Sequence, residues 1–109
     1  MSAEISTGRL RSLVMEAAQA VSDGRIETAD GGAASRALEA IVAAMKQSAT
    51  LRPVYGEVLA KATRDYAAVL GESLPRRMAG EISAKDFKDL MRAAAAEHKE
   101  VKERVERAA

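Results

Sequence analysis

Apolar residues recur at every third or fourth position along most of the chain, a spacing typical of the buried face of an α-helix. The first stripe predicts a helix that begins near Ser6 or Thr7, because either hydroxyl can cap the free amides of a first turn. Gly24 favours a stop after this helix. Its apolar positions are Leu10, Leu13, Val14, Ala17, Ala18 and Val21.

A second stripe predicts a helix over residues 33–48. Gly31 and Gly32 lie just before it, and Asp30 can accept hydrogen bonds from its first free amides. The positions that make up the stripe are Ala34, Ala37, Leu38, Ile41, Val42 and Met45.

A third helix is predicted to begin at Pro53, because proline suits the first helical position and disfavours helix at Arg52 before it. Gly71 predicts the end of this helix in a left-handed conformation. Residues 73–79 then predict one short helical turn that closes at Gly80. The stripe of the third helix consists of Tyr55, Val58, Leu59, Ala62, Tyr66, Val69 and Leu70.

The last helix is predicted to start at Ser83, where the hydroxyl and Asp86 three residues later approximate a capping box. From there it runs to the end of the chain. These elements predict an all-α fold, namely a compact bundle of four main helices plus a short helical turn, antiparallel where the connections are short. We expect residues 1–109 to form a single domain, with residues 83–109 as a long C-terminal helix that can project as an interaction arm.

The apolar positions of the last helix follow spacings of 4, 3, 4, 3, 4 and 3, which is a heptad pattern. Two interpretations remain open. The stripe can pair with another helix outside the domain, or its first half can pack on its own domain while its second half projects into solvent. In either case His98 lies on the stripe, so a pH-sensitive association is one hypothesis. The stripe consists of Phe87, Met91, Ala94, His98, Val101, Val105 and Ala108.

The composition favours closely packed helices around a core of small apolar volume. Of 109 residues, 24 are alanines and two are prolines. Alanine has the highest helix propensity, but each one buries about one methyl group, worth about 0.8 kcal/mol. We therefore expect a marginally stable monomer. A coding bias toward alanine would give the same count without structural purpose.

Charge and cysteine content limit the partners and the cell compartment that we expect for the protein. Lys and Arg number 17 and Asp and Glu 16, a net charge of +1, so no strong overall field attracts polyanions. The absence of cysteine suits a reducing compartment. Neither the first 13 residues nor any later run is apolar enough for a signal peptide or a membrane span. We therefore expect a cytoplasmic protein with no membrane partner.

One segment looks like the second half of a calcium-binding EF-hand loop. Gly80, Ile82 and Asp86 stand where such a loop places its glycine, its isoleucine and its last acid. The positions that should supply the first three oxygen ligands are instead Pro75, Arg77 and Ala79. The sequence therefore predicts no calcium site.

Other catalytic and metal-binding patterns fail in the same way. His98 is the only histidine, and Ala95 occupies the position where a di-iron bundle would carry glutamate. No nucleophile elbow accompanies this histidine, and the glycine pair at residues 31–32 lacks the lysine of a phosphate-binding loop. We expect a protein that is not an enzyme and that has no catalytic residue, metal or cofactor.

The sequence instead favours a non-catalytic protein–protein interaction module, such as an adaptor, accessory or inhibitor protein. It would act by helix–helix packing with a protein partner, with a second copy of itself, or with both. The residues predicted to form the interface are Phe87, Leu90, Met91, His98, Val101 and Val105.

The alternative is a small regulatory protein that associates with DNA or RNA. Residues 51–80 contain five basic and three acidic side chains, a local charge of +2. Lys85, Lys88 and Arg92 could extend this face if the helices lie side by side. The candidate nucleic-acid contacts are Arg52, Lys61, Arg64, Arg76 and Arg77.

Overall fold

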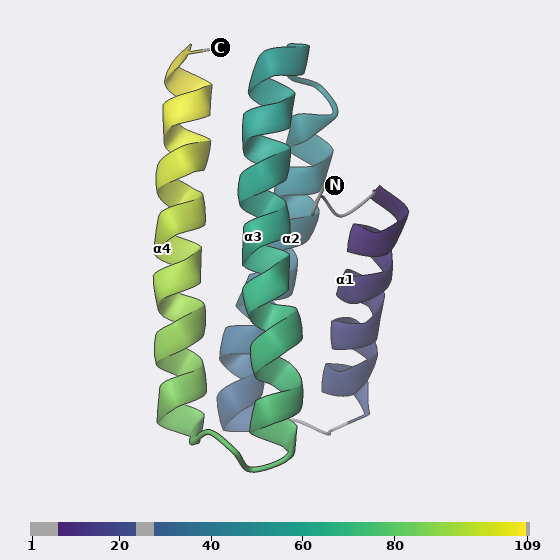
Figure 1. Cartoon of the computed structure of the whole chain (residues 1–109), viewed down its shortest axis with the longest axis vertical. Helices are drawn as coiled ribbons and strands as arrows, with labels where there is room; N and C mark the ends of the chain where they lie inside the picture. Colours follow the sequence, from purple (N-terminus) through teal and green to yellow (C-terminus); the bar gives the residue numbers. More distant parts are fainter. Residues whose placement is uncertain (1–6, 24–27, 109) are drawn as a thin grey trace, which may run out of the picture.

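The computed structural model describes residues 7–23 and 28–108, and every regular element in these two ranges is an α-helix. The helices are α1 (Thr7–Ser22), α2 (Thr28–Ser48), α3 (Pro53–Met78) and α4 (Ala84–Ala108). Successive helices run in opposite directions, so α2 and α4 point the same way (Figure 1). The bundle measures 41 × 26 × 25 Å. The all-α prediction with four main helices is confirmed.

The start of α2 differs from the prediction. The helix begins at Thr28, so Asp30, Gly31 and Gly32 lie inside it and Asp30 is not its cap. A glycine in a helix interior costs only about 1 kcal/mol, and alanines buried in the next turns anchor the helix. For α1, the predicted cap at Ser6, the stop at Gly24 and the side chains of Leu10, Ala18 and Val21 lie outside the described residues.

The predicted start of α3 is confirmed, whereas its predicted end at Gly71 is wrong. Pro53 occupies the first turn, and the backbone N–H of Gly56 donates to the carbonyl oxygen of Arg52 at 2.8 Å. The helix then continues through Gly71 and Pro75 to Met78. The short helical turn expected at residues 73–79 is therefore the last part of α3. Burial of Ser73 and Leu74 against the bundle holds these turns in the helix.

The connection between α3 and α4 matches the sequence closely. Gly80 has φ +77°, a left-handed conformation that ends the helical segment at the position where the sequence predicted a stop. The N–H of Glu81 donates to the carbonyl oxygen of Arg76 at 2.8 Å, which closes the end of α3. Ser83 Oγ accepts a hydrogen bond from the N–H of Asp86 at 3.0 Å, so the predicted cap of α4 is confirmed.

The core runs along the centre of the bundle, and its members are small. Seven of the thirteen buried residues in the main cluster are alanines. The cluster consists of Ala17, Ala20, Ala33, Ala34, Ala37, Ile41, Tyr66, Ala67, Leu70, Leu74, Phe87, Met91 and Ala94. Such a core brings the helices close together but excludes little apolar surface from water per residue.

The apolar stripe of α4 packs inside the bundle as far as Val105, and Ala108 at its end is exposed. Phe87 has no exposed surface, and His98 and Val105, which lie further along the helix, are only 5% and 4% exposed. The helix lies beside α3 from end to end (Figure 1). In this structure α3 supplies the apolar face that the heptad pattern of α4 requires, and the second half of the helix lies along the bundle as far as Val105.

Candidate functional site

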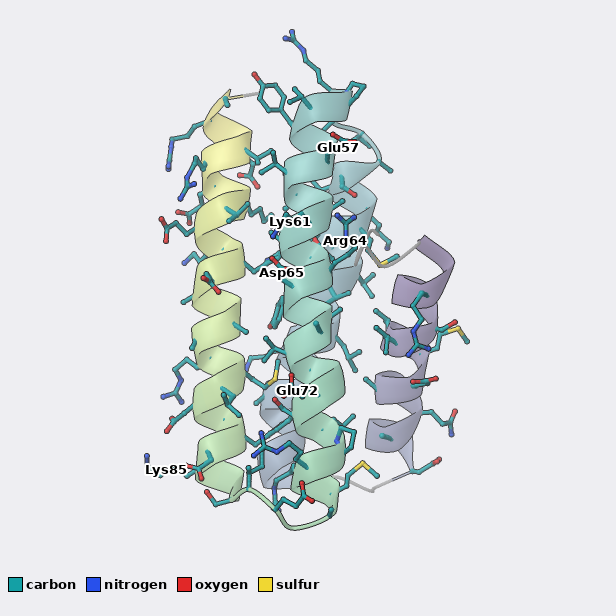
Figure 2. The ribbon with its side chains drawn as sticks, viewed as in Figure 1. Glu57, Lys61, Arg64, Asp65, Glu72 and Lys85 are labelled. Carbon is teal, nitrogen blue, oxygen red and sulfur yellow. The ribbon has the colours of Figure 1, made fainter. Side chains whose placement is uncertain are left out.

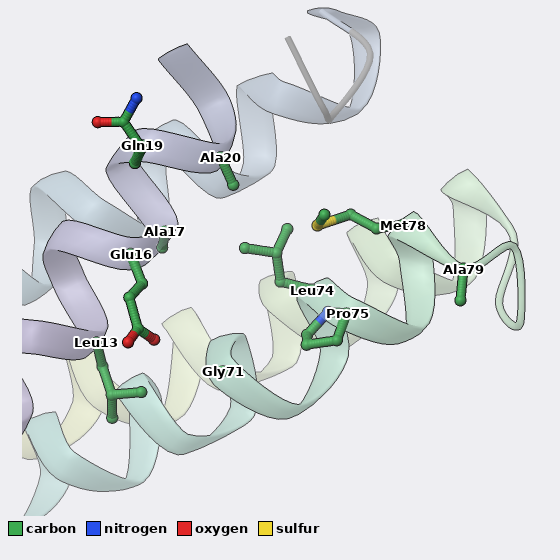
Figure 3. Close-up of a pocket in the computed structure, with 10 residues that line it drawn as sticks. All are labelled: Leu13, Glu16, Ala17, Gln19, Ala20, Gly71, Leu74, Pro75, Met78 and Ala79. Carbon is green, nitrogen blue, oxygen red and sulfur yellow. The ribbon is translucent and has the colours of Figure 1, made fainter. Parts of the chain in front are cut away.

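An apolar groove lies between the second half of α1 and the last turns of α3 (Figure 3). Its volume is about 620 Å³. Small residues help to open it, because Ala17 and Ala20 of α1 and Gly71 of α3 are part of its lining. The groove is lined by Leu13, Glu16, Ala17, Gln19, Ala20, Gly71, Leu74, Pro75, Met78 and Ala79.

The groove combines an apolar floor with one carboxylate. The Glu16 side chain is directed from α1 toward α3, whereas Gln19 points away (Figure 3). Gln19 Nε2 instead donates to Asp23 Oδ1 at 2.7 Å. Met78 forms part of the opposite wall and is 42% exposed. The site can therefore accept an apolar side chain that is followed by a positive charge.

A complementary surface lies at the other end of α3, and we call Val54, Val58 and Lys61 the valine patch. Val54 is 61% exposed and Val58 48% exposed. The three residues follow spacings of four and three, so they share one face of the helix. Lys61 Nζ lies 3.0 Å from Asp65 Oδ2, a surface ion pair that costs little to break.

The six interface residues predicted on α4 do not form one exposed surface. Four are buried in the chain's own bundle, and Val101 is partly buried. Leu90 alone among the six is classed as exposed, at 40%. The buried four are Phe87, Met91, His98 and Val105. Packing against α3 therefore removes most of the predicted interface from contact with a partner.

His98 takes part in a small buried network with α3. Its Nε2 atom lies 3.3 Å from Thr63 Oγ1, and its ring lies 5.2 Å from that of Tyr66, centroid to centroid. Thr63 Oγ1 also lies 2.8 Å from the carbonyl oxygen of Leu59, to which it donates its one proton. His98 Nε2 must therefore carry a proton and donate it to the threonine. This assigns the neutral Nε2–H tautomer to the ring.

Electrostatics keep this network neutral. Burial lowers the pKa of His98 below its usual value, and the positive charge of Lys102 lowers this pKa further. Burial also raises the pKa of Tyr66, against a smaller opposite effect of Arg36. The histidine is therefore a neutral structural group at pH 7, placed where the sequence suggested an interface residue.

The five candidate nucleic-acid contacts do not converge. They are spread from Arg52, just before α3, to Arg77 near its end, and a helix rise of 1.5 Å per residue puts about 38 Å between these two positions. Acidic residues interrupt the row: Figure 2 shows Glu57, Asp65 and Glu72 on the same helix as Lys61 and Arg64. Arg76 Nε lies 3.8 Å from Glu81 Oε2.

Within residues 7–23 and 28–108 no three acidic or histidine side chains lie close enough together to hold a metal ion. None of the helices in that part of the chain is both long and apolar enough to cross a bilayer.

Comparison with protein-family models, with curated proteins and with solved structures found no significant match. The α1–α3 groove and the valine patch are therefore the basis for a functional proposal.

Proposed function

We propose that this protein is a non-catalytic interaction module that self-associates, with the valine patch of one copy seated in the α1–α3 groove of the next. The observation that carries the proposal is the presence, on one chain, of an apolar groove with a carboxylate and of an exposed apolar patch with a lysine. A second copy supplies the matching chemistry without any further partner.

The fit between the two surfaces has an apolar and a charged component. Val54 and Val58 would lie against Leu74 and Met78, which removes apolar surface of both copies from water. Lys61 follows one turn later and would face Glu16, which forms no ion pair with another described residue. Charge pairing of this kind sets register and orientation more than affinity.

The two surfaces lie at opposite ends of α3, so one copy can use both at once. The interface is then heterologous, with different surfaces of the two copies in contact. Repetition of such a contact produces a ring if the rotation closes and an open chain if it does not.

The contact surface is small, which predicts weak binding. Complete burial of a valine or methionine side chain gains about 1.5 to 3 kcal/mol, and these side chains are already half-buried in the free protein. After the cost of association, we expect a dissociation constant between about 10 µM and 1 mM.

Sedimentation equilibrium of the full chain across that concentration range tests the proposal. The average mass should rise with concentration for the wild-type protein and stay at that of a monomer for Met78→Lys, which puts a charge in the groove. Met15→Lys is the matched control, because Met15 is 65% exposed on α1 and does not line the groove. A wild-type protein that remains monomeric throughout would refute the proposal.

A further inference from the structure

A separate hollow of about 290 Å³ lies between α2 and α4, away from the α1–α3 groove. Its floor is apolar and is formed by alanines, Met91 and the Tyr66 ring. Its walls carry positive charge from both helices. The complete lining consists of Ala33, Arg36, Ala40, Tyr66, Lys88, Met91, Arg92 and Ala95.

The three cations of this hollow, Arg36, Lys88 and Arg92, lack anionic partners. Among the described residues none of the three forms an ion pair or a side-chain hydrogen bond. Other cations of α4 are paired with carboxylates one turn away, namely Lys85 with Asp89, Lys99 with Glu103, Lys102 with Glu106 and Arg104 with Glu100. No described carboxylate pairs with Lys88 or Arg92, so their positive charges remain available to an anion in the hollow.

Tyr66 adds a hydroxyl donor at the floor. In the described part of the chain no buried polar side-chain atom lacks a partner, and Tyr66 makes no side-chain hydrogen bond. Its hydroxyl must therefore be accessible although the residue as a whole is only 3% exposed. Arg36 and Tyr66 both line the hollow, and the positive charge of Arg36 lowers the pKa of this hydroxyl against the larger effect of burial.

We propose that this hollow binds a small phosphorylated molecule, with its phosphate held by Arg36, Arg92 and Lys88 and its apolar part against Met91 and Ala95. Three positive charges suit a phosphate dianion better than a single carboxylate. The guanidinium groups can each donate two parallel hydrogen bonds to phosphate oxygens. The volume is close to the lower end of the range of about 300 to 1,000 Å³ for small-molecule sites.

Tyrosine fluorescence can follow binding, because the chain contains no tryptophan and only two tyrosines. In a Tyr55→Phe background, Tyr66 is the single reporter. We expect butyl phosphate to change its fluorescence at lower concentration than inorganic phosphate, and butyrate to bind weakest. Measurements at pH 7.5 and constant low ionic strength keep the comparison free of differences in screening.

Four variants distinguish binding in the hollow from nonspecific attraction to positive charge. Arg36→Ala and Arg92→Ala should each weaken butyl phosphate binding about tenfold or more. Arg107→Ala removes the same charge from the far end of α4 and should leave binding unchanged. Ala95→Leu should abolish binding by filling the hollow while it leaves all three cations in place. Circular dichroism of each variant confirms that the bundle is intact.

Each possible outcome either supports the proposal or overturns it. Selective loss in Arg36→Ala, Arg92→Ala and Ala95→Leu supports it. No fluorescence change with butyl phosphate up to tens of millimolar, an equal loss in Arg107→Ala, or undiminished binding by a folded Ala95→Leu variant overturns it. It is also overturned if butyl phosphate does not bind while random duplex DNA does, where DNA binding is measured by anisotropy and depends on the three cations.

Discussion

At the scale of single residues, the contact between His98 and Thr63 shows how a polar pair is accommodated in a thin core. The threonine proton goes to the carbonyl oxygen of Leu59, so its oxygen is left to accept the histidine N–H. Each polar atom of the pair therefore depends on the other. The contact links α3 to the middle of α4 at a point where the sequence suggested an exposed interface.

The effects of removing the two partners should therefore not be additive. We expect Thr63→Val to lower the free energy of unfolding by about 1 to 3 kcal/mol, because it leaves the buried N–H of His98 without an acceptor. The double variant with His98→Phe should be less destabilised than the sum of the two single variants. Urea denaturation measures the free energy of unfolding of the wild-type protein, the two single variants and the double variant. Strict additivity of the two effects would contradict the assigned hydrogen bond.

The same histidine predicts a pH dependence of stability. Its pKa in the folded chain lies below the usual 6.5, mainly through burial, so the unfolded chain binds the proton more readily. The stabilising contribution is complete above about pH 6.5 and is lost as the pH falls toward the folded pKa, by at most about 1.4 kcal/mol per pH unit.

Urea denaturation between pH 7.5 and 5.5 checks this sign. Asp65 and Glu97 line a small pocket together with His98 and are present in both the wild-type protein and His98→Gln, so the comparison of the two removes their contribution. The wild-type protein should lose stability as the pH falls, and His98→Gln, which keeps an N–H donor, should not. An equal slope in both proteins would show that another group is responsible.

At the scale of helices, two glycines of α3 have opposite structural roles. A Cβ at Gly71 would lie 3.6 Å from Leu13 Cδ2, an ordinary contact, whereas a Cβ at Gly56 would lie 2.9 Å from the backbone oxygen of Ser48. Gly56 is therefore required by the close approach of α2 and α3. Gly71 leaves space that helps to open the α1–α3 groove.

We expect the same substitution to have opposite effects at these two positions. Gly71→Ala should raise the free energy of unfolding by about 0.5 to 1 kcal/mol through improved helix propensity. Gly56→Ala should lower it, because backbone must shift to admit the methyl group. Thermal unfolding at low protein concentration compares the two variants directly. Destabilisation by both would mean that α3 is not a continuous helix through Gly71.

The signals that the sequence revealed correctly are those decided within a few residues. Pro53 starts α3, Gly80 ends it and Ser83 caps α4, and each of these depends only on neighbouring backbone groups. Gly71 misled because a glycine also fits inside a helix when the turns after it, here with Leu74, are buried. A glycine therefore allows a helix to end, and the burial of the residues after it determines whether the helix ends there.

The candidate site was harder to predict than the fold. The heptad pattern of α4 identified which face is apolar, but it could not identify the helix that covers this face. The α1–α3 groove arises from what is missing at Ala17, Ala20 and Gly71, and absent side chains leave no periodic signal. The cationic hollow combines Arg36 with Lys88 and Arg92, which are far apart in the sequence and become neighbours only because α2 and α4 run in parallel.

At the scale of the whole molecule, an alanine-rich core and exposed apolar side chains favour association. The bundle uses its larger side chains to hold α2, α3 and α4 together, whereas the buried core residues from α1 whose side chains the structure describes are Ala17 and Ala20. The space left beside α1 is the groove, and the apolar residues that could fill it stand at the other end of α3. Self-association would therefore bury surface that the monomer leaves in water.

The most direct measurement is sedimentation velocity of two blocked variants, alone and mixed. Met78→Lys blocks the groove, and Val58→Asp blocks the valine patch by placing a carboxylate against the apolar floor of the groove at Leu74 and Met78. Each variant alone should be monomeric, because one half of the interface is missing in every copy. Mixed in equal amounts at several hundred micromolar, they should form a species of twice the monomer mass and nothing larger, since one intact groove meets one intact patch. A mixture that stays monomeric, or a variant that associates on its own as the wild-type protein does, would contradict the account.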